Sequence, residues 1–223
     1  MTKIVWAALG GLAALAALSD GTAEAQPKEL PAEVVTLSGT AELHRKDTPT
    51  WKGAELRDLV GEGDSVRTQV GGRTTLKTGS GQALRLGSRS QVAFVASEPG
   101  GPIRARLDNG WLWVAVSPNS PPPTQVEVRS GPTVVTVRGG GVGLRRGPEG
   151  ALLVQVHYGV AQLAGPERRW ERTLTGPMQL LIPASGAPAA PAPLTVEPIE
   201  ATWAKWNADQ DAAGGYGVTK PAP

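Results

Sequence analysis

The feature that most constrains the fold of this chain is a series of short runs in which side chains alternate in character, separated by glycines. In one run Leu84 and Leu86 share a face while Arg85 takes the other. In an earlier run Val66 and Arg67 lie on opposite faces. Strict alternation marks strands with one buried and one solvent-facing side. The glycines at positions 61, 63, 71, 72, 79, 81 and 87 supply the positive φ angles that tight turns require.

The same alternation continues from residue 34 to residue 182, and no long helical period occurs in that range. We count about a dozen strands of the usual short length. The 29 glycines and 20 prolines are spread along the chain without a collagen-like period, which fits many strands and turns. The sequence therefore predicts an all-β fold. A twisted, solenoid-like stack and a two-sheet sandwich both accommodate the pattern.

The N-terminus has the pattern of a secretory signal peptide. Lys3 precedes an apolar run, Ile4–Leu18, and a small-x-small cleavage pattern follows at 23–25. The apolar run is shorter than the roughly 20 residues of a comfortable membrane span. We predict a signal peptide at 1–25 that is cleaved before Gln26, and hence a periplasmic or secreted protein. The alternative is an uncleaved N-terminal anchor.

The remaining chain divides into three parts by composition. Residues 26–183 form the predicted all-β domain, and residues 184–196 are an Ala/Pro-rich linker expected to be extended. Residues 197–223 contain the one predicted helix, over Glu197–Asp211, followed by a disordered tail. Trp203 and Trp206 are three residues apart and therefore lie on one side of that helix.

Composition and charge exclude several functional classes. The chain has no cysteine, which rules out disulfides, thiol catalysis and cysteine-ligated metals. Its 22 basic and 20 acidic residues nearly balance, and the arginines occur singly rather than in a block, so nucleic-acid binding is not indicated.

The candidate chemical sites have simpler structural interpretations. His44 and His157 have no partner at metal-ligand spacing and are interpreted as surface histidines. The glycine-rich segment 139–143 leads into a turn, whereas a dinucleotide site requires it to open a helix. Glu62 and Asp64 share a turn, in which Asp64 is expected to bond backbone N–H groups, with Ca²⁺ binding or catalysis as the alternatives. We therefore predict no enzyme activity, no cofactor and no metal.

One strand has large apolar side chains on both faces. In residues 111–116, Leu112 lies on the core side while Trp111 and Trp113 lie on the other. Either the Trp203/Trp206 side of the C-terminal helix packs four indoles together here, or the two strand tryptophans remain open as an interaction face. Trp111 and Trp113 are accordingly the candidate interaction residues.

Ordered segments of this chain resemble the FecR domain. The first part of the resemblance comprises Trp51, the turn Gly-Asp-Ser-Val-Arg-Thr at 63–68 and the strand Leu-Arg-Leu-Gly-Ser-Arg-Ser at 84–90. Residues 107–114 are similar to the family's "L-x-x-G-x-L-x-V" strand. The positions expected to be structural are Trp51, Gly63, Asp64, Val66, Arg67, Leu84, Leu86, Gly110, Gly139 and Gly159.

The resemblance continues downstream and includes one departure. Residues 126–139 are similar to the family's "V-x-T-x-x-x-V-x-V-R-G" segment, and residues 154–160 to its "V-x-V-x-x-G-x-V" strand. The family usually has "R-G-T-x-F-x-V" where residues 138–144 read Arg-Gly-Gly-Gly-Val-Gly-Leu. The threonine and the aromatic residue of that pattern are absent.

The resemblance implies a solenoid-like fold and a non-catalytic role. FecR domains form the envelope portion of iron-dicitrate-type sensor regulators and also occur in stand-alone secreted proteins. The resemblance implies that this chain is an interaction or sensing module in the bacterial cell envelope. Such a module would have a protein partner, no nucleic-acid partner and no stable membrane span after signal cleavage. The alternative is a glycan- or peptidoglycan-binding module that uses the aromatic strand face.

Overall fold

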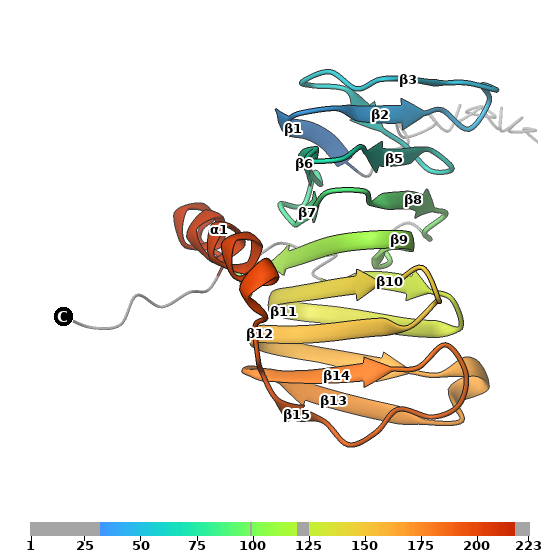
Figure 1. Cartoon of the computed structure of the whole chain (residues 1–223). Helices are drawn as coiled ribbons and strands as arrows, with labels where there is room; N and C mark the ends of the chain where they lie inside the picture. The colour runs from blue at the N-terminus through green and yellow to red at the C-terminus, as the bar shows by residue number, and fades with distance from the viewer. Residues whose placement is uncertain (1–31, 99, 120–124, 217–223) are drawn as a thin grey trace, which may run out of the picture.

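The computed structural model describes residues 32–98, 100–119 and 125–216. The predicted signal peptide at 1–25 and the tail at 217–223 lie outside these residues. The all-β prediction is confirmed, because the described chain is one continuous sheet of 15 strands with a single α-helix (Figure 1). The elements are β1 (Ala32–Ser38), β2 (Ala41–His44), β3 (Trp51–Gly53), β4 (Leu59–Val60), β5 (Ser65–Thr68), β6 (Arg73–Lys77), β7 (Ala83–Leu86), β8 (Gln91–Val95), β9 (Ile103–Val116), β10 (Val126–Ser130), β11 (Thr133–Arg146), β12 (Leu152–Ala164), a 3₁₀ turn (Pro166–Arg168), β13 (Glu171–Thr175), β14 (Met178–Ile182), β15 (Ala192–Pro193) and α1 (Pro198–Gly214).

The strand pairings divide the sheet into two rows. The first row runs β4-β1-β6-β7 and continues through one half of β9, β11 and β12 to β14 and β15. The second row runs β3-β2-β5-β8 and continues through the other half of β9, then β10, β11, β12 and β13. The three long strands thus belong to both rows, and the sheet folds over on itself into an elongated stack (Figure 1).

Each long strand changes row at a glycine with positive φ. The angles are 85° at Gly110, 110° at Gly140 and 83° at Gly159. Gly140 pairs with Gly159, and a Cβ on Gly140 would lie 2.1 Å from the Tyr158 carbonyl oxygen. Only glycine fits this approach of two bent strands. The threonine that the family pattern places at position 140 would not fit here, which accounts for that part of the departure.

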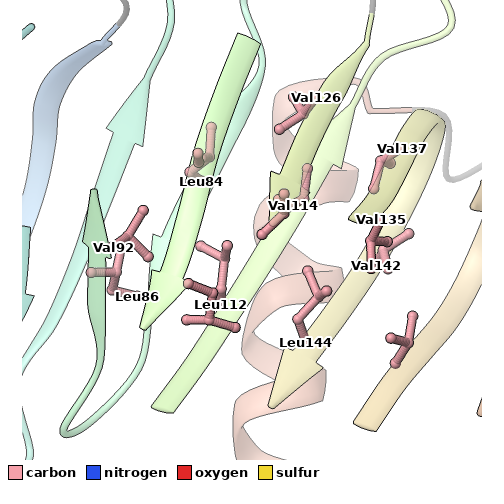
Figure 2. Packing of buried hydrophobic residues seen from close by; sticks show 14 of the residues in the cluster. Leu84, Leu86, Val92, Leu112, Val114, Val126, Val135, Val137, Val142 and Leu144 are labelled. Carbon is pink, nitrogen blue, oxygen red and sulfur yellow. The ribbon is translucent and has the colours of Figure 1, made fainter. Parts of the chain in front are cut away.

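The hydrophobic core lies between the two rows. Leu84, Leu112 and Val142 from the first row and Val66 and Val92 from the second are fully buried in one cluster. Within the first row Leu84 pairs with Val114 and Leu112 with Leu144, so apolar side chains meet strand by strand (Figure 2). The inward residues predicted from alternation are therefore the core residues of the structure.

The turn of the family motif is organised by Asp64. Its carboxylate accepts backbone N–H bonds from Gly61 at 2.8 Å and Lys46 at 2.9 Å, and an Arg45 guanidinium N–H lies 3.0 Å away. The predicted bonding of Asp64 to its own turn is thus confirmed. Gly63 has φ 86°, a conformation that favours glycine.

The C-terminal helix lies against the first row, on the side away from the core (Figure 1). Pro198 occupies its first turn, and Gly215 ends it in the left-handed conformation with φ 73°. The helix extends three residues beyond the predicted end at Asp211, to Gly214. Two residues of the predicted linker, Ala192–Pro193, form the short strand β15.

Candidate functional site

The outward side chains of the first row form a continuous surface beneath α1. Arg85 of β7 pairs across the sheet with Trp113 of β9, Trp113 pairs with Gly143 of β11, and Gly143 pairs with Gln155 of β12. Tyr158 of β12 also reaches this surface. We call the side chains that form hydrogen bonds or ion pairs with the helix the helix-docking face. They are Arg85, Trp113, Arg145, Gln155 and Tyr158.

Asp211 of α1 lies at the centre of this face and is fully buried. Its Oδ2 accepts hydrogen bonds from Trp113 Nε1 at 2.8 Å and from the Tyr158 hydroxyl at 2.5 Å. Its Oδ1 accepts one from the guanidinium of Arg85 at 2.5 Å. Charge-assisted bonds of this kind are about twice as strong as neutral ones. Three donors from three strands therefore converge on one carboxylate.

A second carboxylate anchors the other end of the helix. Glu200 is buried, with Oε1 2.8 Å from the Arg145 guanidinium, and its Oε2 accepts a hydrogen bond from Gln155 Nε2 at 3.0 Å. Arg145 also lies over the Trp111 ring, 5.0 Å from its centroid. Two acidic residues of α1 thus bind two separate groups of donors on the sheet.

The buried stripe of α1 is polar. Its buried residues are Glu200, Asn207 and Asp211, which fall within about 20° of one line along a helix of 3.6 residues per turn. Asn207 donates to the Trp203 carbonyl at 2.8 Å, and its Oδ1 has no hydrogen-bond partner among the described residues. Helices that pack on a protein core normally bury an apolar stripe. The helix is held both by these polar contacts and by an apolar cluster in which Trp203 and the following Tyr216 pack with Trp113.

The sheet is shaped for the aromatic rings of the docking face. A Cβ on Gly141 would lie 2.4 Å from the Tyr158 ring and 2.8 Å from the Trp113 ring. Glycine at this position therefore leaves room for both rings, whose N–H and O–H groups bond to Asp211.

Burial shifts two pKa values at this site. Burial, strengthened by the hydrogen bond to Asp211, raises the pKa of the Tyr158 hydroxyl well above its usual range, so it stays a donor. Burial lowers the pKa of His157 to about 4. His157 packs against Trp113 with ring centroids 4.6 Å apart. The interpretation of His157 as a surface histidine is therefore wrong, because the side chain is half-buried against the Trp113 ring.

The structure decides between the two interpretations of the Trp111/Trp113 strand. Trp113 is 1% exposed, so it is not part of an open interaction face, whereas Trp111 is half-buried. The predicted cover by the C-terminal helix is confirmed, but the four indoles do not form one stack. Trp203 and Trp206 stack on each other at 5.4 Å, and Trp113 instead packs on His157 and bonds to Asp211.

Sequence reasoning missed the charged partners of this interface. Arg85 was assigned to solvent because it alternates with core leucines, yet it is 3% exposed. Glu200 and Asp211 were not singled out, nor were Tyr158 and Gln155. The available signal was a pair of carboxylates eleven residues apart on the predicted helix, which places them on one side.

Within the described parts of the chain, no group of three potential metal ligands occurs, and no helix has the length and apolar character needed to cross a membrane. Two small cavities of about 200 and 190 Å³ lie near the ends of the stack, lined respectively by residues around Arg45 and around Trp170. Neither cavity contains residues of the helix-docking face.

Two of three comparisons with known proteins gave matches, one to a family and one to solved structures. Residues 64–162 match the profile of the family described as FecR protein. No curated protein matches the chain. Two crystal structures, each described as a "putative anti-sigma factor" from Parabacteroides distasonis, share its fold with a TM-score of 0.52 and 13% identity. The matches cover 62% of this chain and 64% of the first structure, and 68% and 74% for the second. This chain thus spans less than two thirds of the first of these proteins. Residues 64–162, which include the motif turn at Asp64 and the glycine bends that follow it, thus match the FecR family model, and the resemblance predicted from the sequence motifs is confirmed over this part of the chain.

Proposed function

We propose that this chain is an exported, non-catalytic FecR-domain protein that acts by binding another protein in the bacterial cell envelope. The observation that carries the proposal is the family match over residues 64–162. The fold shared with the P. distasonis structures is consistent with a regulatory role, since those proteins are described as anti-sigma factors. Export rests on the sequence of residues 1–25.

The chemistry of the described residues supports binding over catalysis. The buried polar groups of the helix-docking face bond to α1. A general base needs a pKa near the working pH, and the pKa of His157 is lowered to about 4 in a position packed on Trp113.

The test is position-specific photo-crosslinking in cells that produce the protein at native level. A photoreactive residue is placed at the exposed Val70, beside β6, in one strain and at the exposed Leu181 on β14 in another. We expect the protein in the envelope fraction, starting at Gln26, and a discrete crosslinked species from one position but not the other. Mass spectrometry of the crosslinked species then identifies the partner protein.

A protein found only in the cytoplasm would contradict export. A protein that sediments with purified peptidoglycan and gives no protein crosslink from either position would replace this proposal with the glycan-binding alternative. The half-exposed Trp203 and Trp206, which stack on each other beside Arg73, would then be the first residues to substitute.

A further inference from the structure

We propose that Arg85, Trp113 and Tyr158 form a carboxylate-recognition site for an acidic helix, that α1 fills this site in the same chain, and that an acidic helix of a partner protein displaces it. The inference rests on the proposed function in assuming that a protein partner exists. It adds the location of the binding surface, the chemistry of the partner and a state in which α1 covers that surface.

The backbone positions of the site are set by the sheet and not by α1. The three donors come from β7, β9 and β12, whose backbones are fixed by the pairings of the first row. Gly141 leaves room for the rings of Trp113 and Tyr158, which sets the direction of their N–H and O–H groups. A preformed set of convergent donors with aromatic walls is the usual design of a pocket for one anionic group.

A second contact point defines what kind of ligand fits. Arg145 and Gln155 bind Glu200, which precedes Asp211 by eleven residues. Eleven residues of helix span about 16 Å and return to nearly the same side. The face therefore selects a helical segment with two carboxylates at this spacing, because a helix lacking either one would leave buried cations or N–H groups without a partner.

The contacts of α1 are those expected of a helix that can detach from the sheet and bind it again. Its buried stripe is polar, and in such interfaces the desolvation of the charges offsets much of their attraction. Between Pro183 and Ile199 the only buried residue is Pro188, and the segment is joined to the sheet by the short strand β15 and by hydrogen bonds at Leu194 and Thr195. The tether keeps α1 at a high effective concentration, which a free competitor must overcome.

The first experiment opens the site in the full chain. Asp211→Lys places a cation against Arg85 and should release α1. Asp209→Lys is the matched control, since it makes the same charge change two residues away at an exposed position that pairs only with Lys205. Hydrogen–deuterium exchange of residues 198–216 should accelerate at least tenfold in Asp211→Lys and change little in the control, while β9 and β11 core amides stay protected.

The second experiment measures recognition, with a labelled synthetic peptide of residues 194–216 as the probe. We expect saturable binding to the Asp211→Lys chain, and at least tenfold weaker binding to the wild-type chain and to Asp209→Lys, in which α1 occupies the site. A peptide carrying Asp211→Asn should bind the opened chain at least tenfold more weakly than the wild-type peptide. When Arg85→Met is added to the Asp211→Lys chain, the wild-type and Asp211→Asn peptides should bind with equal affinity.

Two results overturn the inference. If Asp211→Lys leaves exchange in α1 unchanged, the carboxylate does not hold the helix. If the opened chain binds the wild-type and Asp211→Asn peptides equally, the face does not recognise a carboxylate. Both measurements use only this chain, so they succeed or fail independently of whether an envelope partner is found by crosslinking.

Discussion

The two sides of the first row bury their residues by different means. On the inner side Leu84, Leu112 and Leu144 pack in an apolar cluster that spans both rows. On the outer side of the same strands, Arg85 and Trp113 are equally buried but contact Asp211. Apolar packing is nondirectional and gains free energy with area, whereas a buried ion pair depends on geometry and gains little net stability. We infer that the inner side sets the stability of the fold and that the outer side sets which helix docks on it.

The largest expected effect tests the inner side. Leu112→Ala removes a fully buried side chain from the centre of the core and should cost about 2–5 kcal/mol of unfolding free energy. Leu181→Ala on β14 is the matched control, because Leu181 is 58% exposed and the change should stay within about 0.5 kcal/mol. Chemical denaturation gives both values. A loss of similar size at both positions would mean that the core is not where the stability resides.

The next effect concerns the turn that joins the core strands at one end of the stack. Gly63→Val puts a β-branched residue at φ 86° and brings its Cβ against the Lys46 side chain. The expected cost is about 1–3 kcal/mol. Thermal unfolding should show a lower Tm, whereas substitution at Gly53, where a Cβ meets nothing within 4 Å and φ is ordinary, serves as the control. An unchanged Tm for Gly63→Val would show that the turn relaxes without strain.

Acid should weaken the outer side through His157. The pKa of this group is about 4 in the folded protein against 6.5 for the unperturbed group, so the unfolded chain binds the proton first as the pH falls. The contribution is fully present above pH 6.5, is lost progressively down to pH 4, and after allowance for partial exposure amounts to about 1–2 kcal/mol. Denaturation curves at pH 7 and pH 4 should differ by less in His157→Gln than in the wild type. Equal differences would place the pH dependence elsewhere.

The smallest expected effect on overall stability comes from the residue with the most hydrogen bonds at the interface. Asp211→Ala should lower the free energy of global unfolding by less than about 1 kcal/mol, because α1 detaches locally and Arg85 becomes solvated instead of remaining buried and unpaired. Amide exchange in α1 should rise while the midpoint of global unfolding barely moves. A loss as large as that of Leu112→Ala would show that α1 and the core unfold together, and the distinction between the two sides would fall.

Much of the fold can be predicted from the local sequence pattern, whereas the helix-docking face cannot. Alternation assigned Leu84 and Leu86 to the core, and Asp64 was correctly assigned to its turn, because both depend on near neighbours in sequence. Arg85 and Asp211 are 126 residues apart, and nothing local marks them as partners. Alternation tells which side of a strand a residue takes but not whether that side meets water, so Arg85 was placed in solvent.

For a related reason, the sequence does not decide between a solenoid-like stack and a two-sheet sandwich. A period of two is the same in a sandwich and in a stack, and the pairing of strands is a long-range property. The glycines at 110, 140 and 159 carried the missing information, since each marks a bend at which a long strand changes row. Their role is visible only when the paired positions are known, as for Gly140 with Gly159.

The strands β9, β11 and β12 belong to both rows. We therefore expect the middle of the sheet to tolerate insertions and deletions poorly and its two ends to tolerate them well. Inserting or deleting a residue inside any of the three would shift side chains in both rows at once and would require matching changes in its neighbours. Among the described residues, the strands at the ends, β3 and β4 on one side and β13 and β15 on the other, each pair with one neighbour and can be lengthened, lost or joined to additional domains without such compensation. Relatives of different length should therefore differ at these ends, and engineered fusions belong there.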